Sequence, residues 1–154
     1  MKWALFIFVA LTGLCTWIYS ITRDTDVSSS PKYGFASFSG TVWRTKVKLA
    51  TGHLEGHTRL IPPIFFDKTD PRYLALPDLR ELSILPIGSR VRIDRLIQDN
   101  GSWGGIQVTA MVDDGTGIER KVYLNTQLLA PNSFLDAIAS SSKTWAVNSD
   151  MLGK

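Results

Sequence analysis

Alternating apolar residues, separated by turn signals at short spacing, dominate residues 88–129 of this chain. Residues 90–93 alternate between charged and apolar, and four apolar residues two positions apart occupy 106–112. A period of two places side chains on one face of a β-strand, and Asn-Gly or Asp-Gly pairs favour tight hairpin turns. Such pairs stand at Asn100-Gly101 and Asp114-Gly115, so the stretch predicts consecutive hairpins and an all-β fold built as a small barrel.

The order of residues within this stretch carries a family resemblance. The residues concerned are Gly88, Val91 and Ile93, then Asn100-Gly101-Ser102-Trp103, then Ile106 and Val108, then Asp114-Gly115, and finally Val122 and Leu128. This order resembles the second half of a bacterial SH3-like domain, over the residues from Gly88 to Leu129. The resemblance implies an SH3-like barrel that binds a peptide, a peptidoglycan fragment or a partner protein of the cell envelope.

The amino-terminal residues predict a membrane segment. The run from Trp3 to Ile21 contains no charged residue, and a helix of that length is close to the roughly 30 Å of a bilayer core. Residues 1–22 are therefore expected to be a cleaved signal peptide or a retained anchor. A third alternative is a lipoprotein signal, in which Cys15 would be lipidated. Lys2 favours the amino terminus inside the cytoplasm, with the domain anchored outside it, or periplasmic or secreted after cleavage.

Four segments follow from these patterns. Residues 1–22 form the signal or anchor, 23–37 a flexible linker, 38–132 the barrel domain, and 133–154 a short helix with a flexible tail. The alternation of Trp43, Val47 and Leu49 predicts the first long strand of the barrel.

Residues 50–86 are predicted to form a long irregular insertion, because prolines interrupt them repeatedly. A short strand at 57–61 and a helical turn at 77–82 are expected within it. Its apolar residues, among them Ile64, Phe65 and Phe66, either plug one open end of the barrel or form a binding loop.

The sequence lacks the residues that most catalytic mechanisms require. The single cysteine excludes an intramolecular disulfide and a cysteine-rich zinc site, and no nucleophile elbow or phosphate loop occurs. His53 and His57 have a spacing that can bind a metal on a helix, which leaves a metal-dependent enzyme as an alternative. Glycines at 52 and 56 flank the pair and argue against a helix. The expectation is therefore a protein without a cofactor that is not an enzyme.

Basic residues alternate with apolar ones along the first strand and along 90–95. They are Arg44, Lys46 and Lys48 on the first strand and Arg90, Arg92 and Arg95 on a neighbouring one, and Arg59 on the short strand at 57–61 is a further member of the predicted basic face. On one face of a sheet these cations would attract an anionic polymer or phospholipid headgroups, and the alternative is an ordinary solvated face. A net charge of only +3 makes nucleic acid an unexpected partner.

The favoured function is thus a membrane-tethered binding module of the cell envelope. Aromatic residues on strands and turns are the expected ligand contacts, namely Trp43, Phe65, Phe66, Trp103 and Tyr123. An accessory or inhibitor subunit of an envelope assembly, docking through the loop 64–82, is a further alternative.

Overall fold

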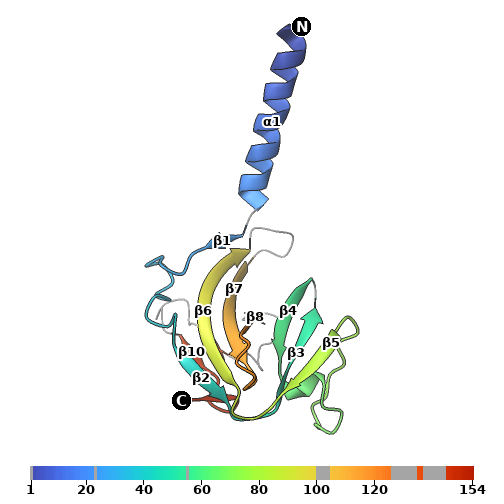
Figure 1. Ribbon diagram of the computed structural model, residues 1–154, viewed down its shortest axis with the longest axis vertical. Helices are drawn as coiled ribbons and strands as arrows, with labels where there is room; N and C mark the ends of the chain where they lie inside the picture. Colours follow the sequence, from blue (N-terminus) through green and yellow to red (C-terminus); the bar gives the residue numbers. More distant parts are fainter. Residues whose placement is uncertain (1, 23, 55, 100–104, 126–134, 137–144) are drawn as a thin grey trace.

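A computed structural model describes the chain except for residues 1, 23, 55, 100–104, 126–134 and 137–144. Figure 1 shows an amino-terminal helix above a curled sheet that forms a half-barrel, so the all-β expectation for the domain is confirmed at this level. The elements are α1 (Lys2–Thr22), β1 (Thr25–Asp26), β2 (Val42–Thr45), β3 (Leu49–Leu54), β4 (His57–Ile61), η1 (Pro63–Phe65), β5 (Arg80–Leu85), β6 (Arg90–Asp99), β7 (Gly105–Asp113), β8 (Arg120–Asn125), β9 (Leu135–Asp136), β10 (Ala146–Val147) and β11 (Leu152–Gly153).

The large sheet has the strand order β11-β2-β6-β7-β8-β4-β3-β5, and β1 adds to it by pairing with β6. Neighbouring strands run antiparallel except β4 and β8, which are parallel and meet at Arg59 and Tyr123. The strands β9 and β10 form a separate two-stranded sheet. The chain from β6 to β8 is a meander of hairpins, as the alternation in residues 88–129 predicts.

The expected first strand is split by a bend at residues 46–48. Its first half, β2, pairs with β6, while its second half, β3, pairs with β4 and β5. The segment from β2 to β3 therefore belongs to both halves of the sheet. The bend within this segment curves the sheet around its core.

Rows of opposed residues fill the inner face of this curl. Ile93 stands opposite Ala110, which stands opposite Val122, and the next row is Leu96, Val108 and Leu124. All six are buried. Burying apolar side chains contributes roughly 25 cal/mol per Å², so these rows supply much of the force that holds the hairpins together.

Two segments that were expected to be flexible pack on the sheet instead. Within 23–37, β1 pairs with β6 and Phe35 is fully buried. Within 133–154, Trp145 is buried and β11 pairs with β2. The expected helix after Ser133 is wrong where it is described, because Leu135–Asp136 is a strand, and its other residues lie outside the described part. Buried apolar side chains without periodic spacing hold these segments, namely Phe35 in the first and Trp145, Val147 and Leu152 in the second.

The expected insertion contains regular structure as well. The strand at 57–61 is confirmed as β4, which pairs with β3 as a hairpin. The helical turn at 77–82 is wrong, because Arg80–Leu85 forms the strand β5 at one end of the sheet. Glu81 has φ of 54° there, and the pairing of β5 with β3 shifts between Thr51 and His53. A β-bulge thus replaces the helical turn.

The helix α1 leaves its described side chains exposed, including Ile7, Phe8, Leu11 and Trp17. Among the residues described, no helix combines the length and hydropathy required of a membrane span.

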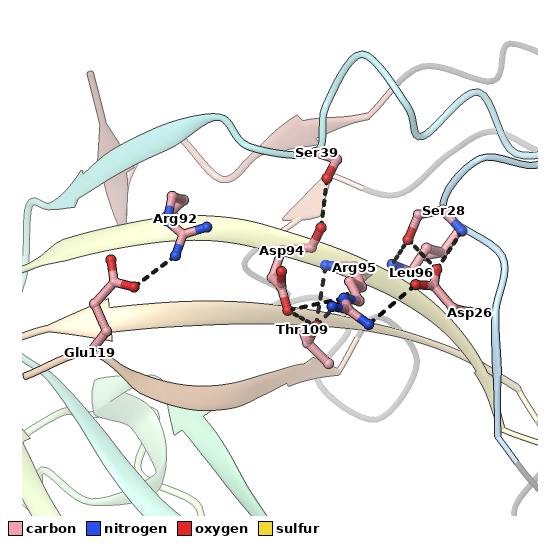
Figure 2. A network of polar contacts seen from close by, with 9 residues as sticks. All are labelled: Asp26, Ser28, Ser39, Arg92, Asp94, Arg95, Leu96, Thr109 and Glu119. Atoms are coloured by element: carbon pink, nitrogen blue, oxygen red, sulfur yellow. Dashed lines mark hydrogen bonds and ion pairs between the residues drawn. The ribbon is translucent and has the colours of Figure 1, made fainter.

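A second β-bulge ties β6 to its neighbours (Figure 2). Between Ile93 and Leu96, two residues of β6 stand opposite the single residue Thr109 of β7. The Thr109 hydroxyl accepts a hydrogen bond from the Arg95 N–H at 3.2 Å and lies 3.3 Å from a carboxylate oxygen of Asp94. Thr109 is fully buried, and its hydroxyl supplies the hydrogen-bond acceptor for the Arg95 N–H within the bulge.

Replacing Thr109 with valine should lower the free energy of unfolding by about 1 kcal/mol, because the Arg95 N–H loses its acceptor while the shape of the side chain is kept. Denaturant unfolding of the full chain in detergent measures the change. Thr58→Val, at an exposed position of β4, is the matched control and should change stability by less than about 0.5 kcal/mol. Equal stabilities of the two variants would contradict this role for Thr109.

Residues of this bulge in β6 also bind the segment that follows α1, at residues 26–28 (Figure 2). The Val27 N–H donates to the Leu96 carbonyl, and the Leu96 N–H donates to the Ser28 hydroxyl oxygen at 2.8 Å. That hydroxyl in turn donates to Asp26 at 2.6 Å, and Arg95 lies 3.6 Å from the same carboxylate. We call this contact of residues 25–28 with β6 the seam between β1 and β6. Only residues 23 and 24 separate α1 from it.

Hydrogen bonds from the Ser28 hydroxyl and the Ser28 N–H, helped by Arg95, lower the pKa of Asp26 below the ordinary aspartate value. A lowered pKa means that the interaction stabilises the fold above the ordinary pKa and is lost as the pH falls through the lowered one. We expect NMR titration to give Asp26 a lowered pKa and Ser28→Ala to raise it. A pKa that is unchanged in Ser28→Ala would show that Ser28 is not the cause.

Candidate functional site

The predicted basic face does not form one continuous surface. Arg44 and Arg90 stand opposite each other on β2 and β6. Arg92 is paired with Glu119 at 2.7 Å, and Arg95 lies near Asp26 and Asp94. Arg92 and Arg95 are therefore neutralised locally, whereas Arg44 and Arg90 form no ion pair within 4 Å with a described residue.

The remaining basic residues are spread over the fold. Lys46 and Lys48 lie in the bend between β2 and β3, and the Lys46 ammonium donates to the Ser149 carbonyl at 2.8 Å. Arg59 is buried within β4. The strand register puts Arg44, Arg90 and Arg92 on one face of the sheet. Lys46 and Lys48 in the bend, and the buried Arg59 on β4, lie elsewhere in the fold.

The two histidines face opposite sides of the sheet. His53 stands opposite Thr58, whereas His57 stands opposite Leu54. Opposed residues share a face and successive residues alternate, so the imidazoles of His53 and His57 point apart. No group of three potential metal ligands occurs among the described residues. The pair therefore has no geometry for a shared metal ion, because the spacing that suits a helix separates side chains on a hairpin.

The predicted aromatic contacts occupy different places. Phe65 is buried in η1 and Phe66 is half-buried beside it, so both serve the core. Tyr123 is half-buried on β8 with its ring 4.6 Å from that of His57. Trp103 lies outside the described residues. Among the described residues, the structure does not bring Phe65, Phe66 and Tyr123 together with Trp43 in one site.

Trp43 lies on the wall of a groove of about 480 Å³ beside β2. The residues lining the groove are Phe38, Thr41, Trp43, Lys46, Trp145, Val147, Ser149, Leu152, Gly153 and Lys154. The Trp43 indole N–H donates to the Thr41 hydroxyl at 3.0 Å, which fixes the ring. The Lys154 ammonium lies 5.7 Å from the centre of that ring. The groove therefore offers a fixed, half-buried aromatic wall with two cations at its rim.

An aromatic cluster supports the far wall of the groove. The rings of Phe35 and Trp145 are 5.1 Å apart and nearly perpendicular, and Phe38 stacks on Trp145 at 6.2 Å. The Trp145 indole N–H donates to the Tyr33 carbonyl at 2.7 Å. Two segments far apart in the sequence thus build one wall, which is rigid because both its apolar and its polar atoms have partners.

No family model, curated protein or solved structure matches this chain. The site is therefore defined by its own geometry. Sequence reasoning identified Trp43 from its position on an alternating strand but missed Trp145 and Lys154, which it placed in a flexible tail. The sequence contains one signal that Trp145 belongs to the folded domain: it is a lone tryptophan in a polar segment, and an aromatic residue of that size is usually buried.

Proposed function

We propose that this protein is a membrane-tethered, non-catalytic binding module of the cell envelope, whose ligand enters the groove beside Trp43. The observation that carries the proposal is the groove itself, in which a fixed indole and apolar side chains stand next to Lys46 and Lys154. Concave, mostly apolar surfaces with a few convergent polar groups are typical of ligand sites.

The chemistry of the groove favours a ligand with an apolar part and a carboxylate. Trp43, Trp145 and Leu152 supply apolar contact area, and the two lysines supply positive charge at the rim. Peptides and peptidoglycan fragments have this combination, and they are the ligands that the SH3-like resemblance implies. An aromatic contact of this kind contributes about 0.5–1.5 kcal/mol beyond the area that it buries.

The proposed tether is α1. Its described side chains from Ile7 to Tyr19 are exposed and mostly apolar, and Lys2 favours the cytoplasmic side for its start. We propose that α1 enters the bilayer as an uncleaved anchor in the inner membrane, which leaves the half-barrel outside the cytoplasm. Lipidation at Cys15 and cleavage after the helix are the alternatives. Intact mass together with membrane fractionation of the expressed chain distinguishes the three.

Truncating Trp43 should weaken the binding of soluble peptidoglycan fragments by about tenfold, which corresponds to roughly 1.4 kcal/mol. Titration of the full chain, with chemical shifts as the readout, measures the effect at 50 mM and 500 mM salt. Trp17→Ala, on α1, is the control for losing a tryptophan away from the groove. Equal affinity in Trp43→Ala and wild type, or complete loss of binding at high salt, would contradict the proposal.

A second candidate function is an accessory subunit of an envelope assembly. The observation that favours it is β5, a strand at one end of the sheet that exposes Leu82 and Ile84. Such a strand is able to pair with a partner chain. Ile84→Lys should abolish co-purification of that partner from native membranes without affecting the Trp43 groove.

A further inference from the structure

A second hollow, of about 310 Å³, lies on the opposite face of β2 from Trp43. It is bounded by the turn between β5 and β6 and by the turn that follows β7. Its charged residues are Arg44 and Arg90 on one side and Asp113 and Asp114 on the other. Trp43 stands opposite the buried Val91, while Arg44 stands opposite Arg90, so the two hollows are separated by the sheet.

Three of the four charges are placed by strand register. Arg44 stands opposite Arg90, and Arg90 stands opposite Asp113, so the three form one row across β2, β6 and β7. Directly opposed residues have Cβ atoms about 4.5–5.5 Å apart. Positive and negative charge thus lie within a few ångströms of each other on one face.

Two of these charges, on Arg44 and Asp113, have neutral backbone groups as hydrogen-bond partners. The Arg44 guanidinium donates to the Gly88 carbonyl at 3.1 Å. Asp113 accepts from the Gly115 N–H at 2.8 Å and the Gly117 N–H at 3.1 Å. Among the described residues, no ion pair within 4 Å joins either arginine to either aspartate.

Asp114 is also fixed as an anion. It accepts from the Thr116 N–H at 3.1 Å. Hydrogen bonds from the Thr116 hydroxyl and N–H, with Arg120 nearby, lower the pKa of Asp114. Asp113, at the end of β7, and Asp114, directly after it, both accept hydrogen bonds from backbone N–H groups of the following turn, while the two arginines lie on β2 and β6.

The equal number of cations and anions that line this hollow indicates which kind of ligand it binds. Two cations and two anions sum to zero, so a simple anion or a simple cation is attracted by one pair and repelled by the other. A small molecule with both charges contacts each pair favourably. We propose that this hollow, which we call the Arg90 pocket (Arg44, Arg90, Asp113 and Asp114), binds a small zwitterion with a carboxylate or phosphate next to an ammonium group. Free amino acids and the phosphoethanolamine headgroup share this chemistry.

The test uses the full chain in a nonionic detergent, because a zwitterionic detergent would compete. Alanine and phosphoethanolamine are titrated separately, with the amide signals of Gly88 and Gly115 as the readout. Acetate and ethylamine are the singly charged controls. Saturable binding of either zwitterion, with a Kd below about 5 mM and at least fivefold tighter than both controls, supports the proposal, and the tighter ligand identifies the source.

Two variants test the geometry. Arg90→Gln and Asp114→Asn should each weaken zwitterion binding at least fivefold, and the asparagine keeps an oxygen to accept from the Thr116 N–H. Arg80→Gln, an exposed arginine on β5, is the matched control and should bind as wild type does. Acetate binding as tightly as alanine, or an undiminished affinity in Asp114→Asn, would overturn the proposal, as would the absence of saturation at 50 mM in folded protein.

Discussion

Trp145→Ala should destabilise the domain by about 3–5 kcal/mol, the largest effect that we expect from a single substitution. Trp145 is 8% exposed, and it packs on Phe35 and Phe38 while donating to the Tyr33 carbonyl. Its removal leaves a cavity and also releases the segment around Phe35 from its partner. Denaturant unfolding followed by near-UV circular dichroism measures the loss.

Two further substitutions separate the contributions at this position. Trp145→Phe keeps an aromatic ring but loses the indole N–H, so it should cost less than Trp145→Ala. Trp17→Ala removes an exposed tryptophan from α1 and should leave the unfolding of the half-barrel unchanged. If Trp145→Ala and Trp17→Ala unfold at the same denaturant concentration, the carboxy-terminal segment is not part of the folded unit.

Gly52→Ala should destabilise the domain by about 1–3 kcal/mol through overpacking. A Cβ at this position would lie 2.5 Å from the Leu79 Cδ1 and 3.5 Å from the Ile61 Cγ1. Gly52 stands beside the bulge at which β5 leaves its regular pairing with β3, and Leu79 occupies the space that the missing side chain leaves. Thermal or denaturant unfolding of the variant gives the magnitude.

A double-mutant cycle tests the cause of that destabilisation. In a Leu79→Ala background the close contact is gone, so Gly52→Ala should cost at least about 1 kcal/mol less than it does alone. Gly13→Ala, in α1, introduces a methyl group with no atom within 4 Å and is the matched control. Additive effects of the two substitutions would mean that Leu79 is not what requires glycine at this position.

The hairpins from β6 to β8 could be predicted from the sequence because their information is local. Val108, Ala110 and Val112 alternate within one strand, and Asp114-Gly115 provides the following turn. The segments around Phe35 and Trp145 could not be predicted, because each depends on a partner more than 100 residues away in the chain. Short strands such as β1 and β11 have no period to detect, so only tertiary pairing defines them.

The candidate site likewise has a part that could be predicted from the sequence and a part that could not. Trp43 was predictable as an aromatic residue on an alternating strand, and the opposed arginines 44 and 90 follow from the same alternation. The groove and the Arg90 pocket were not predictable, because their other walls come from residues 145–154 and from two turns. The spacing of His53 and His57 alone could not decide whether the two imidazoles share a face, because that depends on the hairpin register.

The seam between β1 and β6 determines how far from the end of α1 the Arg90 pocket lies. Thr25 pairs with Gln98 near one end of β6, whereas the Arg90 pocket lies at the other end. Eight residues of strand separate the two points, which corresponds to roughly 25 Å. If α1 lies in the bilayer as proposed, β6 acts as a spacer that keeps the pocket beyond the headgroups of that same membrane. The pocket would then sample solutes and the cell wall, and we expect alanine to be the ligand that binds.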